Sequence, residues 1–283
     1  MQMHLQNPDF KALSHRRPNP YGRGDMARSD DMRDLADTEA LPKARGNTET
    51  GIPDLWNSLQ LVLPDVQRHA SSGAPLVDYH RDHPASKAFD LLRTRLVQAL
   101  RQNGWNKIAV VAPTTGCGAT FTAVNLALSL ARVPGSRSVL IDLDQRAPGV
   151  AATMGIDGDW PIADFLSGRC ETDEHVIRCS DTLALALNTK TNPDAAEQLH
   201  DDVTTAVLED CMEELSPDVV LYDLPAMLEY DDMAAFLPQV DGVLLVTDGT
   251  RTTKAQIEEC ERILDGQTRL LGVVLNRGRS APH

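Results

Sequence analysis

From residue 84 onward, apolar runs rich in β-branched residues alternate with segments of helical periodicity. The runs expected to form strands are KIAVVA (107–112), SVLID (138–142), TLALAL (182–187), DVVLYD (218–223), DGVLLVT (241–247) and LLGVVLN (270–276). Helical segments are expected between them, at 119–133, 193–215 and 251–265. Runs such as VVLY are apolar on both faces, which is typical of strands covered by helices on both sides. The alternation predicts right-handed βαβ units and an α/β fold with a doubly wound, mostly parallel sheet flanked by helices.

The composition is different before residue 75. Seven of the 17 prolines fall within residues 1–75, where few apolar patterns support a core. We expect a largely disordered, flexible N-terminal segment over 1–75 and a single domain over 76–283. Within the first segment, the apolar residues of IPDLWNSLQLVLPDVQRH (52–69) recur at helical spacing and predict a short amphipathic helix. Such a helix either docks on the domain that follows or binds a partner.

The charge and cysteine content narrow the function classes. Lys and Arg number 27 against 41 Asp and Glu, a formal net charge of −14, so a non-specific grip on nucleic acid or anionic lipid is not expected. No run of apolar residues is long enough for a membrane-spanning helix. The five cysteines show no C-x-x-C spacing, which argues against a zinc site or a disulfide framework and favours the reducing cytoplasm.

The first expected strand runs into the loop PTTGCGAT (113–120) and then into a helix. A strand, a G-x-x-x-x-G-K-[ST] loop and a helix form a P-loop, in which amides at the helix N-terminus hold phosphate. Gly116 and Gly118 permit a tight anion-binding loop, and Thr120 stands where a hydroxyl ligates Mg²⁺. Pro113 replaces the first Gly, however, and Ala119 replaces the Lys. The loop alone therefore also fits a plain tight turn between a strand and a helix.

Polar side chains end three further strands. Asp142 and Asp144 lie at the end of the second strand, Asp223 ends the fourth and Asn276 ends the last. The carboxyl ends of parallel strands meet at one edge of the sheet, where ligands bind, so we expect these side chains near the loop. A carboxylate at Asp223 suits a bound Mg²⁺, and an amide at Asn276 suits the edge of a base. Together with the loop, these residues predict a nucleotide site.

The segments AFDLLRTRL, GCGATFTAVNLALSLAR, VLIDLDQRAP, DVVLYDLPA and DGVLLVTDGTRTTKAQIEECERIL with LLGVVLNRG, within about residues 84–278, resemble a known family. It is the bacterial tyrosine kinase (BY-kinase) branch of the ParA/MinD-like P-loop ATPases. The resemblance implies a P-loop NTPase fold with ATP or ADP and Mg²⁺ as cofactors. The nucleotide-binding residues it implies are Thr115, Gly116, Cys117, Gly118, Ala119, Thr120, Phe121, Asn276 and Arg277. It further implies that Thr120, Asp142 and Asp223 hold Mg²⁺ and that Asp142 and Asp144 serve catalysis.

Three hallmarks of the family are altered here. Ala119 stands at the position of the P-loop Lys, and losing one such electrostatic contact typically costs about 3–4 kcal/mol, or roughly 10²–10³ in rate. The E-x-x-R-x-x-R pattern that packs subunits into rings is represented by Lys87, Asp90 and Arg93, of which only the last agrees. The C-terminus RGRSAPH has no tyrosine cluster. We therefore expect binding of ATP and Mg²⁺ with impaired catalysis.

The resemblance implies a BY-kinase-like protein that regulates exopolysaccharide or capsule synthesis or export. It would be cytoplasmic and peripheral at the inner membrane, through a membrane-embedded activator of the polysaccharide co-polymerase type. Homo-oligomer formation stays open, and no nucleic-acid partner is expected. Two alternatives remain. One is a non-catalytic scaffold of a polysaccharide export complex. The other is a ParA/MinD-type positioning ATPase, which the absence of a basic surface and of a C-terminal amphipathic helix disfavours.

Overall fold

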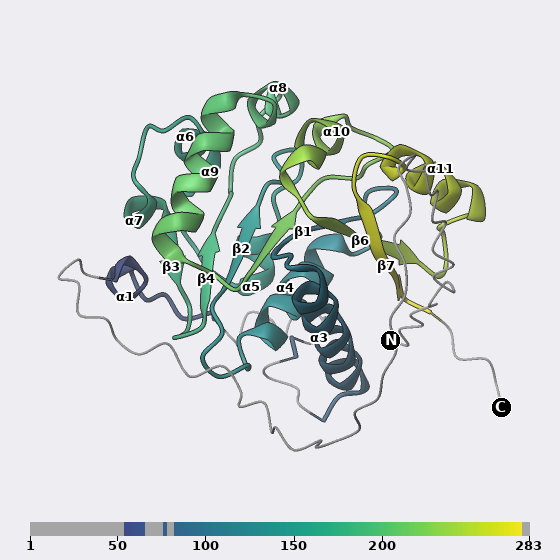
Figure 1. The fold of residues 1–283 in the computed structure, drawn as a ribbon, viewed down its shortest axis with the longest axis horizontal. Helices are drawn as coiled ribbons and strands as arrows, with labels where there is room; N and C mark the ends of the chain where they lie inside the picture. Colours follow the sequence, from purple (N-terminus) through teal and green to yellow (C-terminus); the bar gives the residue numbers. More distant parts are fainter. Residues whose placement is uncertain (1–53, 66–75, 78–81, 279–283) are drawn as a thin grey trace, which may run out of the picture. The chain divides into compact units, whose positions relative to one another are not determined.

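The structure, a computed structural model, describes residues 54–65, 76–77 and 82–278 (Figure 1). Most of the segment predicted to be flexible, and both ends of the helix predicted at 52–69, lie outside the described residues. The predicted domain boundary at residue 75 therefore stays a prediction. None of the helices in the described ranges is both long and apolar enough to cross a membrane.

Seven strands form one sheet in the order β3-β4-β2-β5-β1-β6-β7. Their bounds are β1 Lys107–Val111, β2 Ser138–Asp142, β3 Val176–Arg178, β4 Leu183–Ala186, β5 Val219–Asp223, β6 Gly242–Asp248 and β7 Arg269–Asn276. Every neighbouring pair is parallel except β3 with β4. The predicted α/β fold with a mostly parallel sheet is confirmed, and the six predicted strands are present. The antiparallel edge strand β3 is additional, and at three residues it is too short to give a readable pattern.

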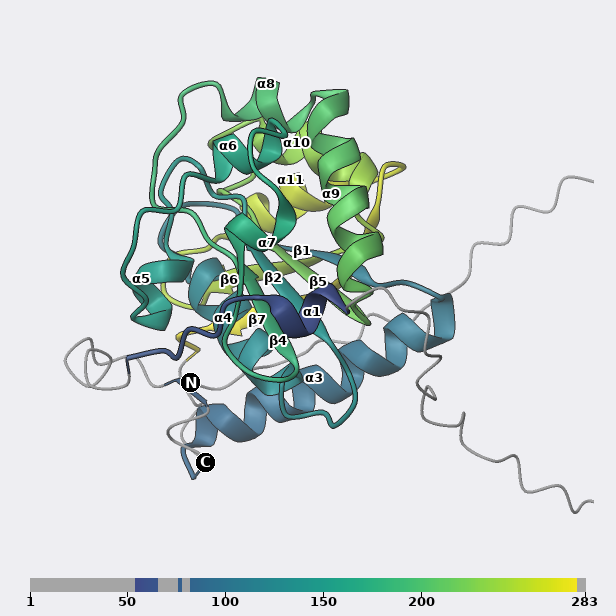
Figure 2. The same cartoon turned by 90° about the vertical axis from the view of Figure 1, so that its left-hand side faces the viewer.

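Helices cover both faces of this sheet (Figures 1 and 2). One face carries α3 Pro84–Asn103, α4 Ala119–Leu130 and α5 Val150–Met154. The other face carries α1 Leu55–Ser58, α6 Ile162–Leu166, α8 Ala195–Leu199, α9 Asp202–Leu215, α10 Asp232–Phe236, η1 Leu237–Gln239 and α11 Lys254–Leu264, with α7 Thr172–His175 leading into β3.

The strands are apolar along their whole length because each face has its own core. In β1, Ala109 and Val111 belong to the core under α9 and α10, whereas Ile108 and Val110 belong to the core under α3 and α4. All four side chains are fully buried. Burying an aliphatic side chain of this size stabilises the fold by about 1.5–3 kcal/mol. The double-sided core fixes the strands and, with them, the positions of the loops at their carboxyl ends.

The prediction of one continuous helix over 193–215 is wrong. The structure has two helices, α8 and α9, separated at His200 and Asp201. The side chain of Asp201 accepts a hydrogen bond of 2.9 Å from the amide of Val203 and caps α9. An aspartate in this role favours an extended backbone at its own position, which ends the preceding helix.

The helix predicted at 52–69 is also wrong in extent. Helix α1 has four residues, and the chain then runs extended, pairing Leu61 with Arg178 of β3. Backbone bonds to the edge strand satisfy the peptide groups there, and Pro64 disfavours a helical conformation for the residue before it. The described part does dock on the domain: the Trp56 side chain is buried, and its Nε1 donates to the Asp181 carbonyl at 3.0 Å.

Candidate functional site

The loop between β1 and α4 has the conformation of an anion-binding cradle. Gly116 and Gly118 adopt φ of +82° and +95°, in the left-handed region that glycine enters without a Cβ penalty. No acceptor in the described part of the chain takes the amide hydrogens of residues 116–120. These amides lie at the N-terminus of the 12-residue helix α4, whose dipole adds a positive field. The loop is thus a set of free donors suited to phosphate.

Side chains from β7 and the loop after β6 hold the carbonyl oxygens of this cradle. Asn276 Nδ2 donates to the Cys117 carbonyl and Arg277 Nη1 to the Gly116 carbonyl, both at 2.9 Å. Arg251 Nη2 lies 3.4 Å from the Thr115 carbonyl. Engaging the carbonyl oxygens fixes the orientation of the peptide planes, because each peptide unit is rigid. The structure thus places Asn276 and Arg277 at the loop, in contact with its backbone.

We expect that Gly118→Ala lowers the free energy of unfolding by about 2–4 kcal/mol, because two penalties add. A Cβ at residue 118 would need φ of +95° and would lie 2.2 Å from Asn276 Nδ2. Gly135→Ala is the matched control, since its φ is +73° but its Cβ would have nothing within 4 Å. It should lose only about 1–2 kcal/mol. Equal losses in urea unfolding of the two variants would contradict the close approach of Asn276.

A buried carboxylate, Asp248, organises the two arginines. It lies at the end of β6, accepts from Arg277 Nη1 at 2.6 Å and from Arg251 Nε at 3.2 Å. Hydrogen bonds from Thr250 and the nearby Arg277 guanidinium hold the pKa of Asp248 well below its usual range. Neither Asp248 nor Arg251 is among the site residues predicted from the sequence. The available signal was the position of Asp248, which follows an apolar strand as Asp142 and Asp223 end theirs.

Asp142 and Asp223 come together as predicted, at the ends of the adjacent strands β2 and β5, where they are register partners. Both side chains are completely buried. Asp142 accepts from the amides of Val150 and Gly149 at 3.0 and 3.2 Å. Burial, with a smaller contribution from the Asp144 charge, raises the pKa of Asp142 from 3.8 to about 7. Burial and the Asp142 charge raise the pKa of Asp223 well above its usual range.

The Asp223 carboxylate has the features of a cation ligand. Neither of its buried oxygens has a hydrogen-bond partner, and leaving a buried polar group unsatisfied costs about 1–3 kcal/mol. The Thr120 hydroxyl is close enough to lower the pKa of Asp223 slightly against the effect of burial. Within the described residues no group of three or more His, Cys, Asp or Glu forms a complete metal cage. Thr120 and Asp223 therefore fit Mg²⁺, which takes few protein ligands and completes its shell with phosphate and water.

Arg146 is a candidate substitute for the P-loop Lys, but it is paired within the chain, which disfavours that role. Its Nε and Nη2 each lie 3.1 Å from an oxygen of the buried Asp232, and its Nη1 donates to the Pro193 carbonyl at 2.7 Å. Asp144 accepts from the Arg146 and Ala147 amides at 3.0 and 2.9 Å, and burial raises its pKa. The charge of Arg146, whose amide bonds Asp144, is thus offset by Asp232.

Glu229 is a third site residue that was not predicted from the sequence. It lies in the loop after β5, and its carboxylate accepts from the Thr115 amide at 3.2 Å and from the Thr115 hydroxyl at 2.5 Å. The amide of Thr115, which the resemblance assigned to phosphate, therefore has a protein acceptor. No pattern near Glu229 in the sequence marks this contact, because it depends on how two loops meet.

Two other predicted positions have contacts within the chain. The Phe121 ring packs edge-to-face on Phe89 of α3, with centroids 6.2 Å apart. Asp90, from the altered ring pattern, accepts from Ser129 Oγ at 3.0 Å, and Arg93 Nη1 donates to the Ser129 carbonyl at 3.0 Å. Asp90 and Arg93 thus fasten α3 to α4. Whether the chain forms a homo-oligomer through these positions stays open.

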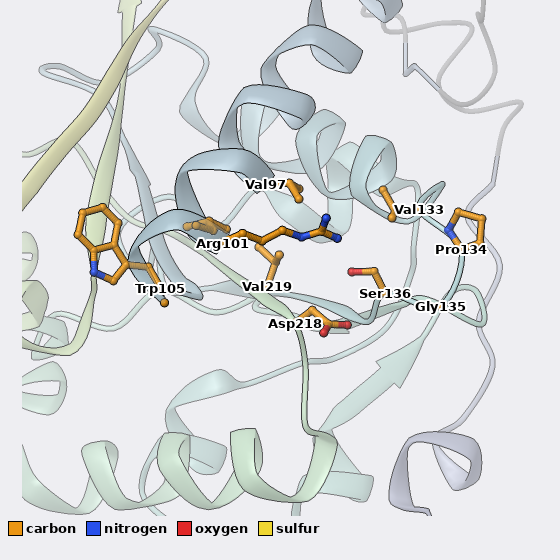
Figure 3. A pocket seen from close by; sticks show the side chains of 11 residues that line it. Val97, Arg101, Trp105, Val133, Pro134, Gly135, Ser136, Asp218 and Val219 are labelled. Atoms are coloured by element: carbon orange, nitrogen blue, oxygen red, sulfur yellow. The ribbon is translucent and has the colours of Figure 1, made fainter. Parts of the chain in front are cut away.

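A cavity lies at the opposite end of the sheet (Figure 3). Val97, Arg101, Trp105, Pro134 and Asp218 are among its lining residues, and its volume is about 260 Å³. Asp218 directly precedes β5 and Trp105 nearly reaches β1, so the cavity is at the amino ends of these strands. Ligands of doubly wound sheets bind at the carboxyl ends. The cradle, with its donors and carboxylates, is therefore the stronger candidate.

Comparison with known sequences points to bacterial tyrosine kinases, although no family model matches the chain. EpsB of Ralstonia solanacearum, named as a tyrosine-protein kinase, is 30% identical over 200 residues. The match covers 69% of this chain and 26% of EpsB, so the chain spans about a quarter of that protein. The tyrosine-protein kinase CpsD of Streptococcus agalactiae is 24% identical over 192 residues, which cover 67% of this chain and 82% of CpsD.

Solved structures show the same fold. The kinase domain of the Escherichia coli tyrosine kinase ETK matches with a TM-score of 0.66 at 21% identity, over 80% of this chain and 92% of that domain. The VpsO kinase domain matches with a TM-score of 0.59 at 25% identity, over 69% of this chain and 98% of that domain. The cell division ATPase MinD of Pyrococcus furiosus matches with a TM-score of 0.50 at 23% identity, over 62% of this chain and 73% of MinD. By sequence and fold, the chain is thus related to the bacterial tyrosine kinases, on an architecture that they share with MinD-like ATPases.

Proposed function

We propose that this chain binds an adenine nucleotide with Mg²⁺ in the 112–120 loop and acts as a catalytically impaired, BY-kinase-like regulatory protein. The observation that carries the proposal is the meeting of two features at one edge of the sheet. The amides of residues 116–120 have no acceptor among the described residues, and neither buried oxygen of Asp223 has a partner. The Thr120 hydroxyl, at the end of the loop, is close enough to Asp223 to lower its pKa. A polyphosphate with Mg²⁺ supplies acceptors for the loop amides and a cation for the Asp223 carboxylate.

Each residue contributes a separate effect in this proposal. The loop amides and the α4 dipole bind phosphate oxygens, and Thr120 with Asp223 and Asp142 provides the ligands for Mg²⁺. Bound Mg²⁺ would offset phosphate charge. Asn276 and Arg277 hold the loop and lie on the β7 side, where the resemblance expects adenine. Asp144 is the residue left to orient an attacking group, but without a Lys at position 119 the developing charge on a transferred phosphoryl group is poorly stabilised.

The physiological setting follows from the relationship and is part of the proposal. Relatives named as tyrosine-protein kinases support the family resemblance, and that resemblance implies a role in exopolysaccharide or capsule production. The chain would then act in the cytoplasm at the inner membrane, recruited by a membrane-embedded co-polymerase-type partner. A scaffold that binds no nucleotide is the alternative that the binding test below separates from this role.

The test is a calorimetric titration of the full chain with ADP and ATP, with and without Mg²⁺. We expect saturable binding that Mg²⁺ strengthens by about tenfold or more, equivalent to about 1.4 kcal/mol. Asp142→Ala should abolish saturable binding and Thr120→Val should remove the Mg²⁺ effect. Thr94→Val is the matched control, because its exposed hydroxyl bonds only within α3, to the Asp90 carbonyl. Absence of binding at millimolar nucleotide would overturn the proposal in favour of the scaffold.

A further inference from the structure

Glu229 places a negative charge on the phosphate-binding loop itself. Its loop is fastened to the start of the cradle by two backbone bonds, from the Met227 amide to the Ala112 carbonyl at 2.9 Å and from the Leu228 amide to the Pro113 carbonyl at 3.1 Å. The Glu229 carboxylate accepts hydrogen bonds from both the amide and the hydroxyl of Thr115. Glu229 and Thr115 are both exposed, so a ligand entering the cradle meets this carboxylate.

The order of the strands shows which end of the cradle Glu229 occupies. β1 lies between β5 and β6, and β7 lies beyond β6. Asn276 and Arg277, where the proposed function puts the base, belong to the β7 side. Asp223 and Glu229 belong to the β5 side. A nucleotide with its base toward β7 extends its phosphate chain toward β5, so its last phosphate is the one nearest Glu229.

The arginines near the loop are each paired with a carboxylate other than Glu229. Arg146 pairs with Asp232, and Arg251 and Arg277 pair with Asp248. Arg251 Nη2 also lies 3.4 Å from the Thr115 carbonyl, whose oxygen is its acceptor there. Position 119, from which a P-loop Lys would reach the terminal phosphates, is an alanine. A third phosphate would therefore approach the Glu229 carboxylate without a P-loop Lys, near arginines already paired with Asp248, and like charges at short range repel. A nucleoside diphosphate has no third phosphate to approach the Glu229 carboxylate.

We propose, resting on the function proposed above, that Glu229 makes this loop select a nucleoside diphosphate over the corresponding triphosphate. The selection arises because Glu229 holds a carboxylate at the end of the cradle toward which a third phosphate extends. Glu229 is a specificity residue, and the chain would then respond to the ratio of diphosphate to triphosphate in its surroundings. The Thr115 hydroxyl and amide fix the carboxylate in place.

The test compares dissociation constants for ADP and ATP in excess Mg²⁺ for the full chain, Glu229→Gln and Glu213→Gln. Gln keeps an acceptor for Thr115 but removes the charge, and Glu213 is an exposed residue near the end of α9, just before β5 begins. We expect ADP to bind the unmodified chain at least about tenfold more tightly than ATP. Glu229→Gln should bring the ratio close to one, chiefly by tightening ATP binding, and Glu213→Gln should leave it unchanged.

The outcomes separate the two proposals. If ADP binds and Glu229→Gln leaves the ratio unchanged, or if the unmodified chain prefers ATP, the selectivity assigned to Glu229 is wrong while the nucleotide site stands. If Glu213→Gln shifts the ratio as much as Glu229→Gln does, the effect is one of overall charge and the assignment is again wrong. If neither nucleotide binds any of the variants, the proposed function fails, and the selectivity with it.

Discussion

Replacing Ala119 by Lys should raise the rate of ATP hydrolysis by this chain by roughly 10²–10³, because an ammonium group is restored where charge develops during phosphoryl transfer. The substitution is at the first residue of α4, where the side chain is only partly buried and can accommodate a longer one. The measurement is phosphate release from ATP with Mg²⁺, beside an assay for phosphate incorporated into the chain. The unmodified chain should be nearly silent in both assays.

Two controls make this result interpretable. Ala119→Met adds length without charge and should gain nothing, whereas Ala119→Lys combined with Asp142→Ala should lose the gain because a carboxylate of the site is missing. Equal activity of the unmodified chain and Ala119→Lys would contradict the account, since another cation would then replace the Lys. Silence of both would show that the carboxylates are not arranged for catalysis and would favour the scaffold.

The contribution of Asp142 and Asp223 to the free energy of unfolding should fall as the pH rises from about 4 to about 7, against a smaller rise from His175, whose pKa burial lowers to about 4. The pKa of Asp142 is 3.8 in its ordinary state and about 7 in the folded chain, and that of Asp223 is also raised. Between these values the folded state binds more protons than the unfolded state, so stability decreases as the pH increases. The difference between the two pKa values of Asp142 corresponds to a loss of about 4 kcal/mol in the free energy of unfolding. This loss is complete once the pH exceeds about 7. Urea unfolding at a series of pH values measures it.

Asp223→Asn isolates this effect from the other titrating groups. The variant removes one buried charge and lowers the pKa of Asp142, so its stability should fall less steeply with pH. It should match the unmodified chain at about pH 4 and exceed it at pH 8. Mg²⁺ with ADP should also flatten the curve, because a bound cation favours the ionised carboxylates. Parallel curves for the two chains would contradict the burial and mutual repulsion of Asp142 and Asp223.

The strands and the sheet could be predicted from sequence because strands covered on both faces are apolar throughout. The runs ending at Asp142 and Asp223 were located to within one residue, and the mostly parallel topology followed from their alternation with helices. The predictions that failed concern local competition. Asp201 caps its own helix and splits 193–215, and Leu61 pairs with Arg178 of β3 instead of continuing α1.

The candidate site was predictable only in part. The loop, Asp142, Asp223 and Asn276 follow strands and are visible as strand-terminal residues. Glu229 reaches Thr115 across 114 residues of sequence. A contact of that kind depends on the meeting of two loops, so no periodicity or spacing predicts it. Arg146 shows the same limit, because its pairing with the buried Asp232 is a tertiary contact, and that pairing disfavours Arg146 as the missing cation.

The central claim is that the amides of the loop, and not a lysine, hold the phosphates. The most direct measurement is the amide chemical-shift change of Gly116, Cys117, Gly118, Ala119 and Thr120 in ¹⁵N-labelled full chain as MgADP is added. Large, saturable shifts are expected at these amides, and Thr120→Val should need a higher MgADP concentration to reach them. Shifts that stay absent at millimolar MgADP, or that appear instead at residues lining the cavity in Figure 3, would contradict it.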